Sequence, residues 1–282
     1  MRLVKHKIKN IDYLYLQHSF RKDGKVVTRE KYLGLTIPND IERIKQEFRS
    51  EIQPEYYQQL EKIKTSFQKD WGKLPLSIRE QQKEEVAITF TYNTNAIEGS
   101  TISEAEVRAI VLDKESPAKS LRDIHEAEAH NDTFLAMLES FRPITNKLLF
   151  KWHKDIFNRS KPAIAGKYRE YNVRVGSYFP PEHHEVKKLM NQLVRFINSE
   201  VGTLNPVELA AIVHYRFEKI HPFSDGNGRI GRLLMNHILW FSGYPILVVE
   251  YSRRQQYYRA LQRNEDGFIS YFVRRYKAVH QS

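Results

Sequence analysis

The run His221-Pro-Phe-Ser-Asp225-Gly-Asn-Gly-Arg229-Ile-Gly-Arg232 gathers an imidazole, a carboxylate, an amide, two guanidinium groups and three glycines within twelve residues. Gly226 and Gly228 indicate a backbone that turns tightly or lies against another group, because glycine adopts conformations that other residues avoid. After the run, apolar residues recur with helical spacing at positions 230, 233, 234, 238 and 241. The stretch therefore predicts a glycine turn at the N-terminus of a helix.

Such a turn predicts a site for phosphate, a metal ion and a base. Helix N-termini carry unpaired N–H groups and the positive end of the helix dipole, so they bind anions. Arg229 and Arg232, three apart on the helix, can grip a polyphosphate together. Asp225 would repel that phosphate unless a cation lay between them, which indicates magnesium. His221 stands outside the turn, and its ordinary pKa near ~6.5 suits a general base.

The run matches HPFx(D/E)GNGRxxR, the signature of the Fic family, at every defined position. The chain resembles this family over roughly residues 77 to 275. The resemblance implies an all-α, mostly helical Fic fold that transfers AMP from ATP to a Ser, Thr or Tyr hydroxyl of a target protein. It also implies that His221 is the base and that Asp225 binds Mg²⁺, with Mn²⁺ left open. The remaining implied nucleotide ligands are Asn227 and the backbone of Gly226 and Gly228 on the α-phosphate, and Arg229 and Arg232 on the other phosphates.

A second motif lies upstream, where Thr94-Asn-Ala-Ile-Glu98-Gly99 resembles the inhibitory (S/T)xxxE(G/N) motif of the same family. Without the signature, Glu98 is simply a surface carboxylate near a helix end that Gly99 stops. In members that carry the motif ahead of the signature, its glutamate pairs with the second signature arginine, here Arg232. The resemblance therefore implies that Glu98 restrains AMP transfer by taking a guanidinium that the γ-phosphate needs.

Residues 166–181 break the helical pattern, since residues alternate around a glycine and end at Pro180-Pro181. This pattern predicts a short β-hairpin, and in the family a hairpin here is a flap that aligns the target by strand addition. The resemblance makes four flap residues candidates for lining the nucleotide or target channel: Val175, Gly176, Ser177 and Tyr178. It also places Tyr257 against the base. An ordinary surface hairpin and a core tyrosine remain the alternatives.

Residues 11–34 predict an additional N-terminal β-hairpin around Asp23-Gly24. The family resemblance does not extend to this hairpin, and its role stays open: it caps the fold, recruits a target or pairs subunits. A charged helical stretch from about 40 to 70 follows, which Pro54 is expected to break. Ser77 with Glu80 and Ser103 with Glu106 predict capping boxes. We therefore divide the chain into a hairpin (1–36), a helical region with the inhibitory motif (37–110) and a Fic domain (111–282).

The composition limits the other classes of function. Lysine and arginine exceed aspartate and glutamate by 45 to 34, a net charge of +11, and we interpret this as a basic surface spread along the chain without a nucleic-acid partner. The chain start lacks the apolar segment of a signal peptide and no stretch of eighteen apolar residues occurs, which predicts a cytoplasmic protein without a membrane partner. There is no cysteine for disulfides or thiolate metal sites.

Three functions follow from the sequence. The first is a protein adenylyltransferase whose partners are ATP and a target protein, autoinhibited by Glu98. The second is the hydrolytic removal of AMP from a modified protein, with Glu98 positioning a water molecule. The third is a non-catalytic, basic nucleic-acid-binding regulator. A homodimer that controls Glu98 stays open.

Overall fold

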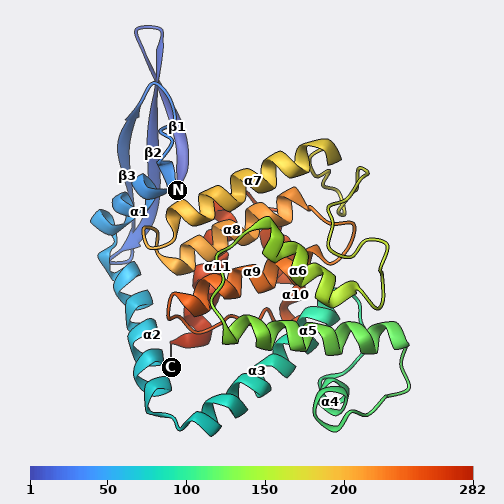
Figure 1. The fold of residues 1–282 in the computed structure, drawn as a ribbon. Helices are drawn as coiled ribbons and strands as arrows, with labels where there is room; N and C mark the ends of the chain where they lie inside the picture. The colour runs from blue at the N-terminus through green and yellow to red at the C-terminus, as the bar shows by residue number, and fades with distance from the viewer. Residues whose placement is uncertain (282) are drawn as a thin grey trace.

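The computed structural model describes residues 1–281 and confirms the mostly α-helical fold (Figure 1). A three-stranded antiparallel sheet of order β1-β2-β3 precedes the helices and consists of β1 (Arg2–Ile8), β2 (Ile11–Lys22) and β3 (Lys25–Gly34). The helices before the signature are α1 (Ile41–Ile52), α2 (Pro54–Lys73), α3 (Leu76–Ile97), α4 (Glu104–Arg108), the π-helix η1 (Ala109–Asp113), α5 (Leu121–Glu139), α6 (Asn146–Phe157) and α7 (His183–Glu200). The remaining ones are α8 (Pro206–Ile220), α9 (Asn227–Phe241), the 3₁₀-helix η2 (Tyr251–Arg253), α10 (Arg254–Leu261) and α11 (Glu265–His280).

Helices α8 and α9 form the centre of the helical body, with the other helices arranged around them (Figure 1). The Asn205 side chain accepts a hydrogen bond from Val207 N at 3.0 Å, and Pro206 takes the first helical position, as the sequence predicted. Every residue of α9 from Asn227 to Leu239 is buried. The signature therefore opens a helix that neighbours surround on all sides.

Helix α3 carries the upstream motif into this body. Its residues are exposed at the start, but nearly all of them from Ala87 to Ile97 are buried. The helix ends at Glu98, and Gly99 follows with a positive φ of 94°, as expected for a residue that stops a helix. The last turn of α3 consequently lies inside the protein, at the end of α9 that holds the signature.

The two predicted capping boxes had different outcomes. The box of Ser103 and Glu106 is confirmed, because Ser103 Oγ accepts from Glu106 N at 3.3 Å and Glu106 Oε2 accepts from Ser103 N at 2.8 Å. The box of Ser77 and Glu80 is wrong. Helix α3 begins one residue before Ser77, with Pro75 as its N-cap, so Ser77 lies inside the first turn where it cannot cap.

The N-terminal hairpin is confirmed as β2 and β3, and β1 adds a strand that the sequence reasoning missed. Leu16 of β2 packs with Phe48 of α1 in a small core of its own. Pro54 separates α1 from α2, as predicted. Among the described residues, no helix has both the length and the apolar character needed to cross a membrane.

The predicted flap hairpin is reduced to a single bridge. Val175 and Tyr178 exchange both backbone hydrogen bonds, each 2.9 Å long, around a two-residue turn. The ladder extends no further because Pro180 and Pro181 have no N–H to donate. Asn172 also turns its side chain to the start of α7, where it accepts from His183 N at 2.8 Å.

Candidate functional site

The signature loop joins the end of α8 to the start of α9. A buried arginine, Arg169, fixes its backbone by hydrogen bonds. His221 ends α8 in the left-handed region, with φ 50°. Arg169 Nε donates to His221 O at 2.9 Å, and Arg169 N donates to Pro222 O at 2.9 Å. The same guanidinium also donates to the carbonyl groups of Tyr171 and Pro181. Arg169 therefore fixes the backbone of His221 and the base of the flap together, a role that no sequence pattern indicated.

The middle of the loop is pinned by Asn227 and His153. Asn227 Oδ1 accepts from Phe223 N and its Nδ2 donates to Phe223 O, both at 2.8 Å. The His153 ring stacks on Phe223, with 4.1 Å between centroids, and accepts from Gly166 N at 2.9 Å through Nδ1. Its Nε2 therefore carries the hydrogen and donates to Asp225 O at 3.0 Å. The Asn227 side chain thus holds the loop, and only its backbone N–H remains for a phosphate.

The signature glycines leave room for neighbouring side chains. A Cβ on Gly226, whose φ is 75°, would lie under 3.0 Å from the Phe157 ring. A Cβ on Gly228 would lie under 3.0 Å from Glu98 Oε1. The predicted close approach at these positions is thus present. At Gly228 the approaching group is a carboxylate, so an anion already sits at the N-terminus of α9.

Arg232 connects α9 to the upstream motif. Its NH2 donates to Glu98 Oε1 at 2.6 Å and to Thr94 O at 3.2 Å, and its Nε donates to Thr94 Oγ1. Only 1% of the arginine is exposed. Burial alone would lower the pKa of Arg232, but Glu98 raises it above its usual value. The ion pair that the resemblance implied is present.

Arg229 pairs with a carboxylate that the sequence reasoning missed. Its NH1 donates to Glu126 Oε2 of α5 at 2.5 Å, and both side chains are almost fully buried. Lys161 Nζ lies 3.0 Å from Glu126 Oε1 and 2.5 Å from Asp225 Oδ2. Burial alone would raise the pKa of Asp225, yet Lys161 and Arg229 hold it below its usual value. Asp225 is therefore a carboxylate with a lysine ammonium on one of its oxygens.

These charged groups surround a polar cavity of about 210 Å³. Its lining residues come from α3 and the loop after it, from α5, from the loop after α6, and from the signature, and they are Asn95, Glu98, Gly99, Ser100, Arg122, Asp123, Glu126, Lys161, Asp225 and Arg229. The cavity brings together the predicted metal ligand, one predicted phosphate ligand and the predicted inhibitory residue. Three cations and four carboxylates in one wall suit a charged ligand with its counterion.

His221 is mostly buried beside this group. Burial lowers its pKa, which the charge of Glu98 partly offsets, so the imidazole is neutral at pH 7. Its Nδ1 lies 3.4 Å from Glu218 O, where it can donate weakly and leave Nε2 free to accept. Burial also raises the pKa of the Glu218 carboxyl to about 8. A neutral imidazole with a free Nε2 has the form that a general base requires.

The residues predicted for the flap and Tyr257, predicted to contact the base, do not line the polar cavity. Val175, Gly176 and Ser177 are exposed, whereas Tyr178 OH donates to Lys219 O at 3.1 Å and ties the flap to the end of α8. Tyr257 is 3% exposed, with its hydroxyl 2.8 Å from His214 Nε2. Tyr257 therefore packs in the core, and its contact with the base stays a prediction.

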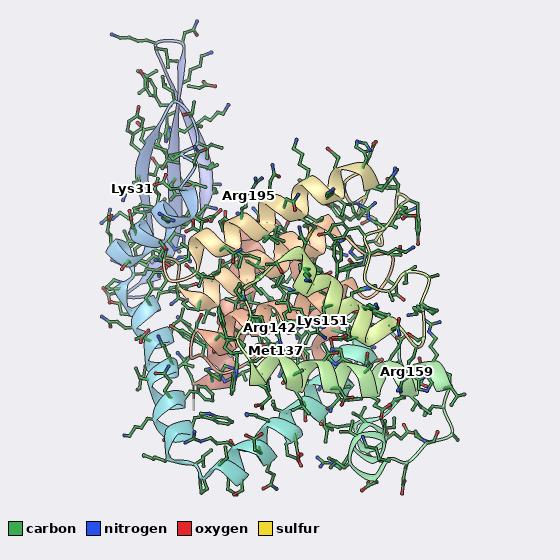
Figure 2. The ribbon with its side chains drawn as sticks, viewed as in Figure 1. Lys31, Met137, Arg142, Lys151, Arg159 and Arg195 are labelled. Carbon is green, nitrogen blue, oxygen red and sulfur yellow. The ribbon has the colours of Figure 1, made fainter. Side chains whose placement is uncertain are left out.

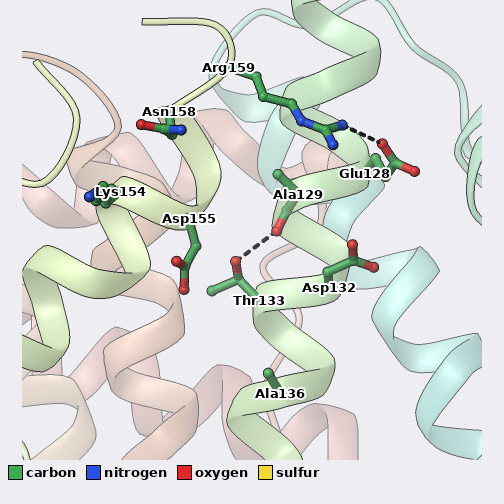
Figure 3. A pocket seen from close by; sticks show the side chains of 9 residues that line it. All are labelled: Glu128, Ala129, Asp132, Thr133, Ala136, Lys154, Asp155, Asn158 and Arg159. Atoms are coloured by element: carbon green, nitrogen blue, oxygen red, sulfur yellow. Dashed lines mark hydrogen bonds and ion pairs between the residues drawn. The ribbon is translucent and has the colours of Figure 1, made fainter. Parts of the chain in front are cut away.

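A larger cavity, of about 490 Å³, lies between α5 and α6 and shares no lining residue with the polar one. Figure 3 shows Glu128, Asp132 and Asp155 around it, with Arg159 NH1 paired to Glu128 Oε2 at 3.3 Å. Thr133 donates its hydroxyl to Ala129 O. The polar cavity is the candidate site, because residues of the signature and of the upstream motif line it and line none of the larger cavity.

Known proteins resemble this chain in sequence and in structure. A family model described as Fic/DOC family matches residues 143–239. A protein adenylyltransferase Fic of Nematostella vectensis is 34% identical over 209 residues, which are 72% of this chain and 48% of that protein. The corresponding protein of Drosophila melanogaster is 34% identical over 68% of this chain and 40% of its own length. The chain thus spans less than half the length of these curated relatives.

Two solved structures share the fold. One is a Fic domain containing signaling protein from Bacteroides thetaiotaomicron, with a TM-score of 0.70 and 26% identity, covering 79% of this chain and 94% of that one. The other is Fic-1 from C. elegans, residues 134–508, with a TM-score of 0.70 and 27% identity, covering 82% of this chain and 72% of that one. Both likenesses extend well beyond the residues of the family match.

Proposed function

We propose that this chain, which carries a Fic domain of the Fic/DOC family over residues 143–239, is a protein adenylyltransferase restrained by Glu98. The relatives named as adenylyltransferases support the activity. The observation that carries the restraint is the carboxylate of Glu98, which lies on Gly228 and Arg232 at the helix N-terminus where a phosphate would bind.

In this proposal the reaction is a displacement at the α-phosphorus of ATP. The target hydroxyl oxygen bonds to that phosphorus, the bond to the β-phosphate bridging oxygen breaks, and pyrophosphate leaves. His221 Nε2 takes the hydroxyl proton, since Nδ1 faces a backbone carbonyl. Backbone N–H groups at Gly226, Asn227 and Gly228 would hold the α-phosphate, because they open α9 and lack helical partners.

The residues present fit a divalent cation of the magnesium type. Asp225 supplies a carboxylate at the edge of the polar cavity, and Mg²⁺ typically takes one or two carboxylates together with phosphate oxygens. When bound, the ion would neutralise phosphate charge. The ammonium group of Lys161 contacts the Asp225 carboxylate. Binding of the ion would require this contact to break or to be shared.

Arg229 and Arg232 differ in what they offer ATP. Arg229 stays tied to Glu126 but keeps its place in the cavity wall, so it supplies positive charge there. The NH2 nitrogen of Arg232 becomes available to a phosphate only when Glu98 leaves, because it donates to Glu98 Oε1 and Thr94 O. Nucleotide can thus bind while Glu98 is in place, but its γ-phosphate lacks the guanidinium that would orient it.

The test is transfer of label from α-labelled ATP, with magnesium, to the protein itself and to proteins of a cell lysate. We expect little label with the wild-type protein, strong label with Glu98→Gly, and none with Glu98→Gly/His221→Ala. Removal of AMP from labelled protein is measured in parallel. Loss of that removal in Glu98→Gly, without any gain of transfer, would assign the carboxylate to hydrolysis and contradict the proposal.

A further inference from the structure

The outer half of the β2–β3 hairpin is a free two-stranded ribbon. Strand β1 pairs with β2 only as far as Gln17. Beyond that point, residues 18–22 pair with residues 25–29 of β3 and with no other described strand. Figure 1 shows this ribbon rising from the helical body to a tip at the far end of the sheet. Lys25, Val26, Thr28 and Arg29 are all exposed on it.

Positive charge is concentrated in this part of the chain. Residues 1–36 contain nine lysines and arginines but only three acidic residues, so they supply more than half of the net charge of +11. The expectation that the charge is evenly spread is therefore wrong. Four of the nine lie on the ribbon, at positions 21, 22, 25 and 29.

The acidic residues of the sheet do not neutralise the ribbon. Asp12 pairs with Lys5 at 3.6 Å, and Glu30 lies 3.1 Å from His6 Nε2. At the base of the sheet, Lys31 pairs with Glu51 of α1 at 3.1 Å, and Figure 2 shows Lys31 beside that helix. Among the described residues, Lys25 and Arg29 have no such partner.

The helical body holds the ribbon in a defined direction. Arg43 of α1 donates to Glu200 Oε2 at 2.9 Å, and Arg49 pairs with Glu208 of α8. Tyr57 OH of α2 donates to Glu208 Oε2 at 2.7 Å. The sheet packs on α1 through Leu16 and Phe48. A ligand bound at the tip would therefore be held at a fixed orientation to the catalytic domain.

We propose that the basic ribbon binds double-stranded DNA in its major groove. That groove is about 12 Å wide and admits a two-stranded β-ribbon. Lys25 and Arg29 lie on one face of the ribbon, because alternate residues of a strand share a face, and their charges suit the phosphates beside the groove and the guanine edges within it. Duplex RNA fits less well, because its major groove is too narrow for side chains. The inference does not depend on AMP transfer.

The test measures fluorescence anisotropy of a labelled mixed-sequence DNA duplex of about 20 base pairs, two helical turns. Lys25→Glu/Arg29→Glu reverses both ribbon charges, and Lys25→Gln/Arg29→Gln only removes them. Lys187→Glu/Lys188→Glu makes the same charge change at two exposed positions early in α7. Equal thermal midpoints across the set establish that the ribbon variants keep the fold.

We expect the wild-type protein to bind the duplex with an affinity that falls steeply with salt. Charge reversal on the ribbon should weaken binding about tenfold or more and reduce the salt slope by about two, and neutralisation should weaken it less. The α7 variant should stay within about threefold. Absence of binding at low salt, or equal loss in the α7 variant, would show that the lysines merely protect exposed strand edges. Equal competition by polyglutamate or duplex RNA would instead assign the ribbon to an acidic protein or to RNA.

Discussion

The two signature arginines, three residues apart on α9, are held by carboxylates in very different settings. Glu126 lies within α5, is 4% exposed, and binds Lys161 as well as Arg229. Glu98 stands at the end of α3, its side chain is 28% exposed, and its ion pair is with Arg232. A buried carboxylate shared by several cations belongs to the framework of the fold. A carboxylate at a helix end that is partly open to solvent can be released at a smaller cost.

Local backbone structure supports this difference. Gly99 takes a positive φ immediately after Glu98, so the helix stops there and the chain turns away. Helix ends open more readily than helix centres. Movement of Glu98 therefore disturbs only the last turn of α3, whereas movement of Glu126 would disrupt α5.

The largest expected effect comes from breaking the buried ion pair of Glu126 with Arg229. Glu126→Ala removes the carboxylate that Arg229 and Lys161 share and leaves Asp225 as the carboxylate beside both cations, which should lower the free energy of unfolding by about 3–5 kcal/mol. The matched change Glu98→Ala should lower it by less, because Glu98 is partly exposed and Arg232 keeps its hydrogen bonds to Thr94. Urea denaturation of both variants measures the difference, and equal losses would remove the distinction between the two pairs.

Gly228→Ala tests the place of Glu98 on α9. A Cβ there conflicts with Glu98 Oε1, so the change should cost about 1–2 kcal/mol of unfolding free energy in the wild-type protein. In a Glu98→Gly background the cost should be smaller, because the conflict with Glu98 is gone and alanine favours a helix over glycine, while the Cβ still lies 2.8 Å from Arg232 NH1.

Gly226→Ala provides the control for that experiment, because its conflict is with Phe157 and is independent of Glu98. It should destabilise both backgrounds equally. Chemical denaturation of the four single and double variants gives the comparison. A Gly228→Ala cost that stays the same after removal of Glu98 would show that the carboxylate does not rest on this glycine in solution.

The parts of this site that lie within short motifs could be predicted from the sequence. The ion pair of Glu98 with Arg232 followed from two matching motifs, and the structure contains it. Sequence reasoning missed Glu126, Arg169, His153 and Lys161, because each is an ordinary residue until the tertiary fold brings it to the signature loop. Their partners lie between 52 and 103 residues away along the chain.

The errors have local physical causes. The flap failed to form a ladder because prolines end it. The third strand β1 was missed because Arg2–Ile8 lacks the alternation typical of a strand: Leu3 and Val4 are adjacent, and Lys5, His6 and Lys7 follow one another. Its existence depends on pairing with β2.

The variant Lys161→Met tests whether the lysine that pairs with Glu126 and Asp225 competes with a metal ion for Asp225. Lys161 places a positive charge 2.5 Å from Asp225 Oδ2, and its removal should raise the affinity for Mn²⁺ about threefold to tenfold by leaving that oxygen free. Titration of Mn²⁺ followed by electron paramagnetic resonance, without nucleotide, measures this. Lys154→Met, an exposed lysine of the preceding helix, is the control. An unchanged or weaker affinity would show that Lys161 does not compete for Asp225.

The smallest expected effect is on the titration of His221. The charge of Glu98 raises the pKa of this imidazole against the lowering effect of burial. Removal of Glu98 should therefore lower the pKa further, so that the neutral base persists to lower pH. We expect the imidazole Cε1–H resonance to titrate at lower pH in Glu98→Gly, and to change little in Glu126→Gln. A shift in the opposite direction would place Glu98 away from His221.

Calorimetric titration of ATP and ADP, each with magnesium, into the wild-type protein and Glu98→Gly tests most directly whether Glu98 takes Arg232 from the γ-phosphate. We expect removal of the carboxylate to strengthen ATP binding about tenfold, since Arg232 then gains a charged partner, and to strengthen ADP binding less than about threefold. Equal gains for ATP and ADP, or no gain for ATP, would contradict competition between Glu98 and the γ-phosphate for Arg232.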